Sequence, residues 1–411
     1  MQLLLPRWLL SLHNNCEVLE NQAVLIENDK ILAVGPAPDL VRAYPQAVQM
    51  PLVNQVLMPG LINMHTHAAM NLLRGAADDL ALHDWLQTRI WPLEGALADA
   101  EFVYDGTVLA AAEMLRNGIT TFNDMYFYPE QTAQAAMDLG SRVVVGITVI
   151  EFPTRYASDA RQYIDLGIAA RDKFKAESTV HWTVAPHAPY TVSDDTFVHM
   201  ATLAEELDIP IHCHLHETAS EVSDAVARHG ERPFARFQRL GLVNERLLAV
   251  HGVHLDDQEL HTMARAGATL VHCPSSNLKL ASGLAPTDRA LKAGVRVVVG
   301  TDGAASNNKL DLWEEGRLAS LLCKGSSGDA TAWPASALLR SMTCDAAHAL
   351  GLEHQIGAIA PGMQADLIAI TVGEHAHQLP NHNLVSKLAY SGAGRDVEHV
   401  WVAGTQVVQS Q

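Results

Sequence analysis

The sequence has few basic residues and no long apolar run. It holds 28 Lys and Arg against 46 Asp and Glu, which gives a formal net charge of −18 with neutral histidine. A surface this acidic repels phosphate backbones and anionic lipids. No apolar run reaches the roughly 18 residues that a membrane-spanning helix needs. The composition therefore argues against nucleic-acid and membrane partners.

Cysteine is scarce as well. The five cysteines are scattered and never form a Cys-x-x-Cys pair, which fits free thiols in a reducing cytoplasm rather than a disulfide framework. The apolar residues 1–15 lack the basic start and the small-residue cleavage site of a signal peptide, so we interpret them as a strand. We therefore predict a cytoplasmic protein.

Histidine, by contrast, is abundant, with 21 positions, several of them inside apolar segments. The first close pair, His65 and His67, ends an apolar run, and in a strand this spacing puts both side chains on one face. Imidazoles side by side suit a borderline metal ion such as Zn²⁺. Alone the pair is a weak pattern, because two surface or core histidines give the same spacing.

The central part of the chain alternates strand-like and helix-like segments. Helix-like segments such as 102–117, 131–139, 194–207 and 258–266 separate eight strand-like runs. These runs are Val56–Met64, Ile119–Phe122, Val143–Ile150, Val180–Ala185, Ile211–Leu215, Leu247–Val250, Thr269–His272 and Val295–Gly300. Eight strands with helical crossovers in about 300 residues match the count and size of a (β/α)₈ TIM-type barrel, an α/β fold.

Both ends of the chain show short apolar runs and turns without a helix pattern. Residues 22–27 and 30–34 flank Asn28-Asp29, a predicted hairpin. The C-terminal end adds the runs Leu367–Thr371, Val397–Val402 and Thr405–Val408. We predict a small β-sandwich domain formed by residues 1–57 and 361–411, beside a barrel formed by residues 58–360.

Catalytic groups in such barrels lie at the carboxyl ends of the strands. Reading the predicted strand ends gives His65, His67, His187, His214 with Glu217, His251, His272 and Asp302. Polar residues at the same end of many apolar runs are hard to explain by packing, and buried histidines need partners. One metal ion would serve several of them at once.

Four of these residues are assigned as ligands of the metal: His65, His67, His214 and Asp302. His214 ends its apolar run and stands three residues before Glu217. Its neighbours His212 and His216 are interpreted as hydrogen-bonded core residues or solvent-facing ones.

Asp302 precedes a glycine turn, so a turn or helix-cap role is the alternative. His251 is either a further ligand or a hydrogen-bond partner that orients the metal's water. The fourth strand-like run has His187 and no lysine to bridge two metals, which predicts one metal ion.

Glu217 is predicted to lie near the metal and to shuttle protons; the alternative is an ordinary glutamate at a helix start. A bound Zn²⁺ supplies hydroxide near neutral pH. Glu217 would protonate a ring nitrogen, hydroxide would add to the adjacent carbon, and Glu217 and Asp302 would return protons to the leaving amine. This chemistry hydrolyses an amidine-like C–N bond, and the geometry fits amide or halide hydrolysis equally well.

Six motifs occur in order along the chain: PGLINMHTH, WLQTRIWPLE, HAPYTVSDD, HLHET, HCPSSNLKLASG and GTDGAASNN. With them the chain resembles the amidohydrolase superfamily over nearly its whole length, and within it the 5′-methylthioadenosine/S-adenosylhomocysteine deaminase family. The resemblance implies the barrel with its terminal β-sandwich, one Zn²⁺ per subunit, and a homodimer or homotetramer. It also implies zinc-dependent deamination of a small nucleoside, 5′-methylthioadenosine, to 5′-methylthioinosine and ammonia.

The resemblance further implies substrate-binding residues. Glu94 matches a glutamate that accepts hydrogen bonds from the ribose hydroxyls, as an acceptor-only carboxylate can; the alternative is a surface helix residue. Trp85 matches an aromatic that lines the nucleoside pocket, although a core tryptophan fits as well. His187 matches a histidine that hydrogen-bonds a purine ring nitrogen, and Ser306 is expected near the same pocket.

One loop departs from the family pattern. Relatives that act on S-adenosylhomocysteine need arginines for its carboxylate, but here the residues 151–156 lean apolar, with Arg155 alone. Adenosine and S-adenosylhomocysteine are therefore expected to be poorer substrates. The rival functions are a guanine-type or triazine aminohydrolase, which would have no ribose for Glu94, and a non-catalytic assembly protein, which would be expected to have lost ligands.

Overall fold

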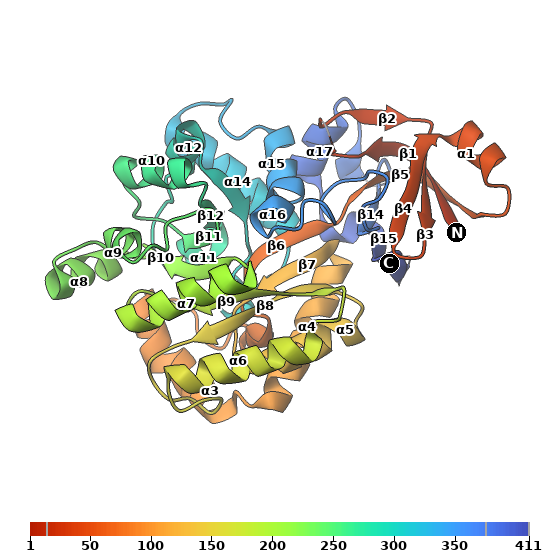
Figure 1. The fold of residues 1–411 in the computed structure, drawn as a ribbon. Helices are drawn as coiled ribbons and strands as arrows, with labels where there is room; N and C mark the ends of the chain where they lie inside the picture. Colours follow the sequence, from red (N-terminus) through yellow and green to blue (C-terminus); the bar gives the residue numbers. More distant parts are fainter. Residues whose placement is uncertain (14, 375, 410–411) are drawn as a thin grey trace.

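The computed structural model describes residues 1–13, 15–374 and 376–409. In it a barrel of parallel strands lies beside a separate sheet in which the two ends of the chain meet (Figure 1). This arrangement confirms the predicted barrel with a second unit built from both terminal segments.

The barrel contains eight parallel strands, hydrogen-bonded in chain order from β6 to β13. They are almost entirely buried, as expected for parallel strands covered by helices on the outside. Two of them, β10 and β12, have the predicted bounds. The strands are β6 (Leu61–Thr66), β7 (Ile119–Asp124), β8 (Arg142–Val149), β9 (Val180–Pro186), β10 (Ile211–Leu215), β11 (Leu247–His251), β12 (Thr269–His272) and β13 (Arg296–Val299).

The predicted first strand, Val56–Met64, was wrong, because it joins two strands of different sheets. β5 (Val48–Pro59) belongs to the terminal sheet, and β6 begins the barrel at Leu61. Gly60 lies between them, where a Cβ atom would come within 2.1 Å of the Thr120 side chain. Glycine thus lets one continuous apolar stretch pass from one sheet to the other.

The barrel closes where its first and last strands meet. The Asn63 amide in β6 accepts the Thr301 N–H at 2.9 Å and donates to the Thr301 hydroxyl at 2.8 Å. One step further, the Asp302 N–H donates to the His65 carbonyl at 2.9 Å. These bonds fix Asp302 next to the end of β6.

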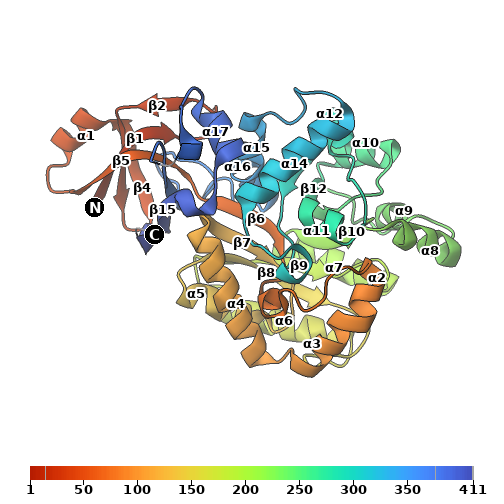
Figure 2. The same ribbon diagram turned by 180° about the vertical axis from the view of Figure 1, so that it is seen from behind.

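Helices cover the outside of the barrel, with α4 to α7 on one side (Figures 1 and 2). No helix in the described part of the chain is both long and apolar enough to cross a membrane. The four predicted helices are confirmed, and α7 has the predicted bounds. The helices from α2 to α16 are α2 (Leu82–Trp85), α3 (Trp91–Leu97), α4 (Ala100–Arg116), α5 (Pro129–Asp138), α6 (Ala160–Phe174), α7 (Asp194–Leu207), α8 (Ala219–His229), α9 (Pro233–Arg239), α10 (Asp257–Ala266), α11 (Pro274–Lys279), α12 (Thr287–Ala293), α13 (Ala304–Asn307), α14 (Leu312–Ser327), α15 (Ala335–Ser341) and α16 (Cys344–Ala349). The 3₁₀ and π helices are η1 (Ala68–Leu73), η2 (Leu86–Ile90), η3 (Ala376–Gln378) and η4 (Gly394–Asp396).

The terminal segments form one mixed eight-stranded sheet, in the order β16-β15-β14-β5-β1-β3-β4 with β2 on β1. β1 and β5 pair in parallel, and the other pairs are antiparallel. One hydrophobic cluster combines side chains from both ends of the chain, such as Leu4 and Trp401. Its strands besides β5 are β1 (Gln2–Leu10), β2 (Val18–Glu20), β3 (Gln22–Glu27), β4 (Lys30–Pro36), β14 (Leu367–Thr371), β15 (Val397–Val402) and β16 (Thr405–Gln409).

The expectation that both terminal segments lack helices was wrong. The N-terminal segment contains α1 (Ala37–Ala43), and the C-terminal segment contains α17 (Leu384–Ser391). Leu384 and Leu388 of α17 are buried in the hydrophobic core of the barrel. Both helices are short, so their apolar positions give too few repeats for a helical period to be recognised.

A buried ion pair links the barrel to the terminal sheet. Arg142, at the start of β8, is completely buried and donates to both carboxylate oxygens of Asp366, at 2.8 and 3.0 Å. Asp366 also accepts the Ala403 N–H at 2.8 Å. An unpaired guanidinium here would be a buried charge without compensation.

Replacing Asp366 with alanine should therefore lower the free energy of unfolding by about 3–5 kcal/mol. Urea denaturation followed by circular dichroism measures the change. The matched control is Asp165→Ala, which removes an exposed pair with Arg161 at 3.7 Å and should leave the free energy nearly unchanged. Equal effects of the two substitutions would contradict a structural role for the buried pair.

Candidate active site

The structure brings the four predicted ligands together at the carboxyl ends of the barrel strands. The His65 Nε2 lies 3.2 Å from the His214 Nε2 and 3.4 Å from the Asp302 Oδ1. The His67 Nε2 is also 3.4 Å from the Asp302 Oδ1. His251 joins the cluster, since one ring nitrogen of each of His65, His214 and His251 lies within 4.8 Å of the others. Donor atoms so close together can share a single cation.

The second ring nitrogen of each of these histidines has a fixed partner. Carbonyl and amide oxygens accept hydrogen bonds from three Nδ1 atoms, which leaves the Nε2 lone pairs free to face the cluster. The pairs are His67 with Met125 O at 2.6 Å, His214 with His187 O at 2.8 Å, and His251 with Asn277 Oδ1 at 2.8 Å. Imidazole lone pairs beside a carboxylate are the donor set that a divalent metal such as zinc prefers.

His65 differs, because its partner is another histidine. Its Nδ1 lies 2.9 Å from the Nε2 of His212, which is completely buried. Burial lowers the pKa of His212 well below its ordinary value, so its ring is neutral and its Nε2 can accept a hydrogen bond from the His65 Nδ1–H. The single N–H of the neutral His212 ring is then on its Nδ1, which has no hydrogen-bond partner among the described residues. The interpretation of His212 as a core residue holds, but its contact with a candidate ligand was missed.

Asp302 is held in a strained and well-bonded position. Its backbone has a positive φ of 62°, which non-glycine residues rarely adopt. Ser276 donates to its Oδ2 at 2.6 Å, and the Gly303 N–H donates to its Oδ1 at 2.7 Å. Burial alone would raise the pKa of Asp302, but its contact with His65 and the nearby His67 and His251 hold it well below its usual range.

Glu217 lies next to this cluster. Its Oε2 is 3.7 Å from the His251 Nε2, and its side chain is buried. Burial, reinforced by the charge of Asp302, raises the pKa of Glu217 to about 8. The carboxyl group therefore holds a proton near neutral pH and can donate it.

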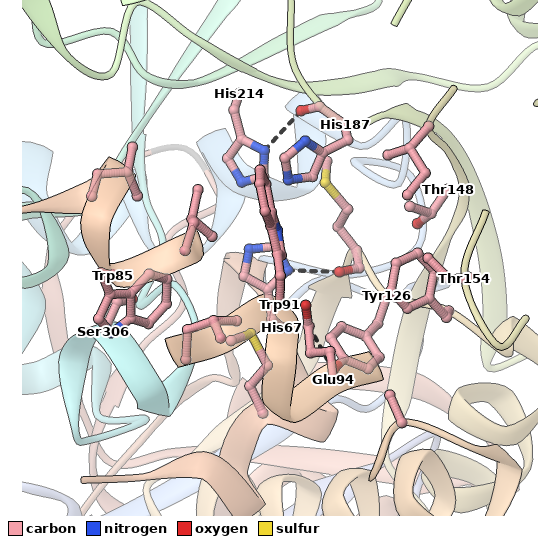
Figure 3. A pocket seen from close by; sticks show the side chains of 18 of the residues that line it. His67, Trp85, Trp91, Glu94, Tyr126, Thr148, Thr154, His187, His214 and Ser306 are labelled. Carbon is pink, nitrogen blue, oxygen red and sulfur yellow. Dashed lines mark hydrogen bonds between the residues drawn. The ribbon is translucent and has the colours of Figure 1, made fainter. Parts of the chain in front are cut away.

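A cavity of about 380 Å³ opens over the cluster. All four residues predicted to contact a substrate, Trp85, Glu94, His187 and Ser306, line the cavity (Figure 3). Four members of the cluster line it as well: His67, His214, His251 and Asp302. Most of the remaining wall is apolar. His272, the other histidine at a strand end, is buried but is not among the described residues that line this cavity.

Glu94 and His187 expose polar atoms to the cavity. Tyr126 donates to the Glu94 Oε1 at 2.8 Å (Figure 3), so the Oε2 is left to accept other bonds. Burial raises the pKa of Glu94, and the Tyr126 bond opposes that rise. The His187 Nδ1 lies 3.0 Å from the Thr191 hydroxyl, which leaves its Nε2 for a ligand.

Trp85 and Ser306 contribute differently. The Trp85 indole donates to the Ala77 carbonyl at 3.1 Å, so its ring is fixed at the cavity wall. The Ser306 hydroxyl donates to the Gly303 carbonyl at 3.2 Å, which leaves its lone pairs as acceptors.

Sequence reasoning missed four supporting residues: Tyr126, His212, Ser276 and Asn277. Ser276 and Asn277 lie in the motif HCPSSNLKLASG and bond Asp302 and His251, respectively. Their place in the short helix α11, which follows the carboxyl end of β12, was a usable signal. His212 is 147 residues from its partner His65, and no local pattern announces that contact.

Comparisons with known proteins show the family and the fold of this chain. Residues 56–407 match a family model described as the amidohydrolase family, and residues 23–47 match one described as a bacterial imidazolonepropionase-like composite domain. A 5-methylthioadenosine/S-adenosylhomocysteine deaminase of Saccharophagus degradans is 43% identical, covering 98% of this chain and 90% of the relative. The zinc-bound structure of an adenosine deaminase from Xanthomonas campestris has a TM-score of 0.96 at 43% identity, covering 100% of this chain and 93% of that one. An atrazine chlorohydrolase of Arthrobacter aurescens, at 22% identity and a TM-score of 0.92, covers 100% of this chain and 96% of its own and shares the fold.

Replacing His214 with alanine should weaken the binding of a divalent metal by more than about 100-fold, since loss of even a supporting partner of a ligand costs 10- to 100-fold. Competition with a chromophoric chelator measures the affinity. His229→Ala, at the exposed end of α8, is the control and should bind the metal like the unchanged protein. Unaltered affinity in His214→Ala would show that the metal is held elsewhere.

Proposed function

We propose that this chain, which belongs to the amidohydrolase family, hydrolytically deaminates 5′-methylthioadenosine to 5′-methylthioinosine and ammonia. The observation that carries the proposal is the pairing of two glutamates in one cavity. Glu217 lies beside the histidine cluster, 3.7 Å from the His251 Nε2, and burial raises its pKa to about 8. Glu94 lies elsewhere in the same wall, and among the described residues only its Oε1 has a hydrogen-bond partner. An adenine base beside Glu217 and a ribose diol beside Glu94 would use both.

The proposed cofactor is Zn²⁺, one per subunit, held by His65, His67, His214 and Asp302. A related structure at 43% identity contains zinc, and the two overlapping groups of donors share His65, which favours one centre. When bound, zinc polarises a water molecule and lowers its pKa toward neutrality.

Side chains of the protein then donate and accept the protons that the reaction requires. Glu217 donates its proton to a ring nitrogen of the purine, which makes the adjacent carbon electrophilic. Once ionised, Glu217 can take a proton from the attacking water and pass it to the leaving amine. Asp302, held ionised, is a second proton acceptor. His251 donates through its Nδ1 to Asn277, so its Nε2 lone pair can accept a hydrogen bond from that water or ligate the metal.

His187 is proposed to bond another purine nitrogen, which requires a proton on its Nε2. The Thr191 hydroxyl lies 3.0 Å from the His187 Nδ1 and 3.1 Å from the Ala188 carbonyl. Substrate binding would therefore favour the arrangement in which Thr191 donates to His187. Trp85 and Ser306 complete the proposed nucleoside pocket.

The preference for a small, uncharged 5′ substituent rests on Arg155. It is the one Lys or Arg among the described residues that line the cavity. Its guanidinium pairs with the Asp99 carboxylate at 3.1 Å and also donates to the Ala96 carbonyl. A carboxylate on the substrate would have to compete with Asp99, so S-adenosylhomocysteine is proposed as a poorer substrate. Adenosine lacks the apolar methylthio group that the wall can bury.

The proposed compartment is the cytoplasm, and the proposed assembly is a homodimer or homotetramer. All five cysteines are free, which supports a reducing compartment. The assembly state rests on the family resemblance. The rival of a non-catalytic scaffold is disfavoured because all four proposed ligands and Glu217 are present in one cluster.

Replacing Glu94 with alanine should lower kcat/KM for nucleosides by about 100-fold or more, because a site built for hydroxyl groups loses its acceptor. The bound metal should remain, since within the described part of the chain no hydrogen bond or ion pair joins Glu94 to the cluster. Steady-state absorbance assays with parallel metal analysis measure both. Loss of the metal would make Glu94 structural, and unchanged kcat/KM would remove the ribose assignment.

Replacing Asp99 with asparagine should raise the kcat/KM for S-adenosylhomocysteine relative to 5′-methylthioadenosine about tenfold, because Arg155 is freed for a charged hydrogen bond. Asparagine keeps the cap that Asp99 provides to the Phe102 N–H at 3.0 Å. Glu101→Gln, an exposed change on the same helix turn, is the control. If the ratio stays constant in Asp99→Asn, Arg155 does not set the preference.

A further inference from the structure

A second buried glutamate, Glu221, holds the backbone that carries Glu217. Its Oε1 accepts the His216 N–H at 2.9 Å, and its Oε2 accepts the Glu217 N–H at 2.8 Å. Glu221 lies in the first turn of α8 and is 9% exposed. We infer that Glu221 is a positioning residue that fixes where Glu217 presents its carboxyl group in the cavity.

The loop needs such support because it leaves the sheet at a strained point. The pairing of β10 with β11 ends at Leu215. His216, the next residue, has a positive φ of 55°, a conformation that side chains other than glycine rarely adopt. Its N–H and that of Glu217 would be buried without partners if no side chain accepted them. The two oxygens of Glu221 satisfy both.

Helix capping alone does not explain these contacts. Thr218 caps α8 by accepting the Glu221 N–H at 3.1 Å, and Thr-x-x-Glu is the sequence pattern of a capping box. In the capping box of α10 the Glu259 carboxylate returns to the backbone of the cap residue, Asp256, at 2.9 Å. Glu221 instead reaches past the cap residue of its helix to the two residues before it.

The His216 side chain is anchored on the other side of the loop. Its Nε2 accepts the Phe234 N–H at 3.1 Å, and its Nδ1 lies 3.5 Å from the Glu259 Oε2. With the His216 ring and the backbone both fixed, the position of the Glu217 carboxyl depends on its side-chain torsions alone. A misplacement of about 1 Å in a reacting group can cost about 100-fold in rate.

The inference rests on the proposed function, in which Glu217 transfers protons, and a double-mutant cycle tests it. Glu221→Gln, Glu217→Gln and the double variant are compared as full-length, metal-loaded proteins with 5′-methylthioadenosine. Glu221→Gln should lower kcat about 10- to 100-fold and leave KM and bound metal nearly unchanged. The double variant should be no slower than Glu217→Gln, because both act through one group.

Thr218→Ala is the matched control, since it removes a cap from the same helix and leaves the Glu221 carboxylate in place. The kcat of Thr218→Ala should stay within about threefold of that of the unchanged protein, because this substitution removes only the hydrogen bond that caps α8. An equal fall in kcat for Thr218→Ala and Glu221→Gln, or a further fall in the double variant, would overturn the inference. If Glu221→Gln does not fold, Glu221→Asp replaces it, and full kcat in that shorter variant would overturn the inference as well.

A crystal structure of the variant separates this inference from the proposed function. Displacement of the Glu217 carboxyl supports the positioning role whatever the substrate is. An unmoved Glu217 contradicts it. Absence of turnover by the unchanged protein on every adenosine-type substrate would instead defeat the proposed function.

Discussion

The candidate site depends on the hydrogen bonds that hold the Nδ1 atoms of its histidines. Met125 and His187 carbonyls, the Asn277 amide and the His212 ring each bind one of them. These bonds fix the ring orientations, and the oxygen acceptors also fix the tautomers, so the Nε2 lone pairs converge. Met125 and His187 directly follow β7 and β9, His212 lies within β10, and Asn277 lies in α11, so closure of the barrel brings these acceptors and the candidate ligands together.

Asp302 and Glu217 are both buried, but their neighbours give them different protonation states. Asp302, beside three imidazoles and bonded by Ser276, has a pKa well below its usual range, whereas burial and the charge of Asp302 raise the pKa of Glu217 to about 8. The proposed C–N hydrolysis requires one carboxylate that stays ionised and one carboxyl group that donates a proton, and these two residues differ in that way. Glu94 lies in α3 and is held by Tyr126, so the proposed function uses different carboxylates for binding and for chemistry.

Much of this was predictable from the sequence, because parallel barrel strands are buried on both faces and read as unbroken apolar runs. Ile211–Leu215 was found with its bounds for that reason, and polar residues that end such runs marked His65, His214 and Asp302. The family resemblance read from six motifs is confirmed by the match over residues 56–407.

Other features depend on distant contacts. The boundary between β5 and β6 was missed because their apolar stretch is continuous, with Gly60 alone between the two strands, and the need for glycine there comes from the distant Thr120 side chain. The role of His212 requires its neighbour across the barrel, His65. Helix α17 was missed because it is short and is stabilised by burial in the barrel core rather than by a long periodic pattern.

The most direct measurement is a side-by-side absorbance assay of the purified, zinc-loaded protein. It compares kcat/KM for 5′-methylthioadenosine, S-adenosylhomocysteine, adenosine, adenine and guanine. We expect the highest value for 5′-methylthioadenosine and little turnover of the free bases, which have no ribose for Glu94. Turnover of guanine alone would contradict the nucleoside assignment, and no turnover of any of them would contradict the proposed deamination.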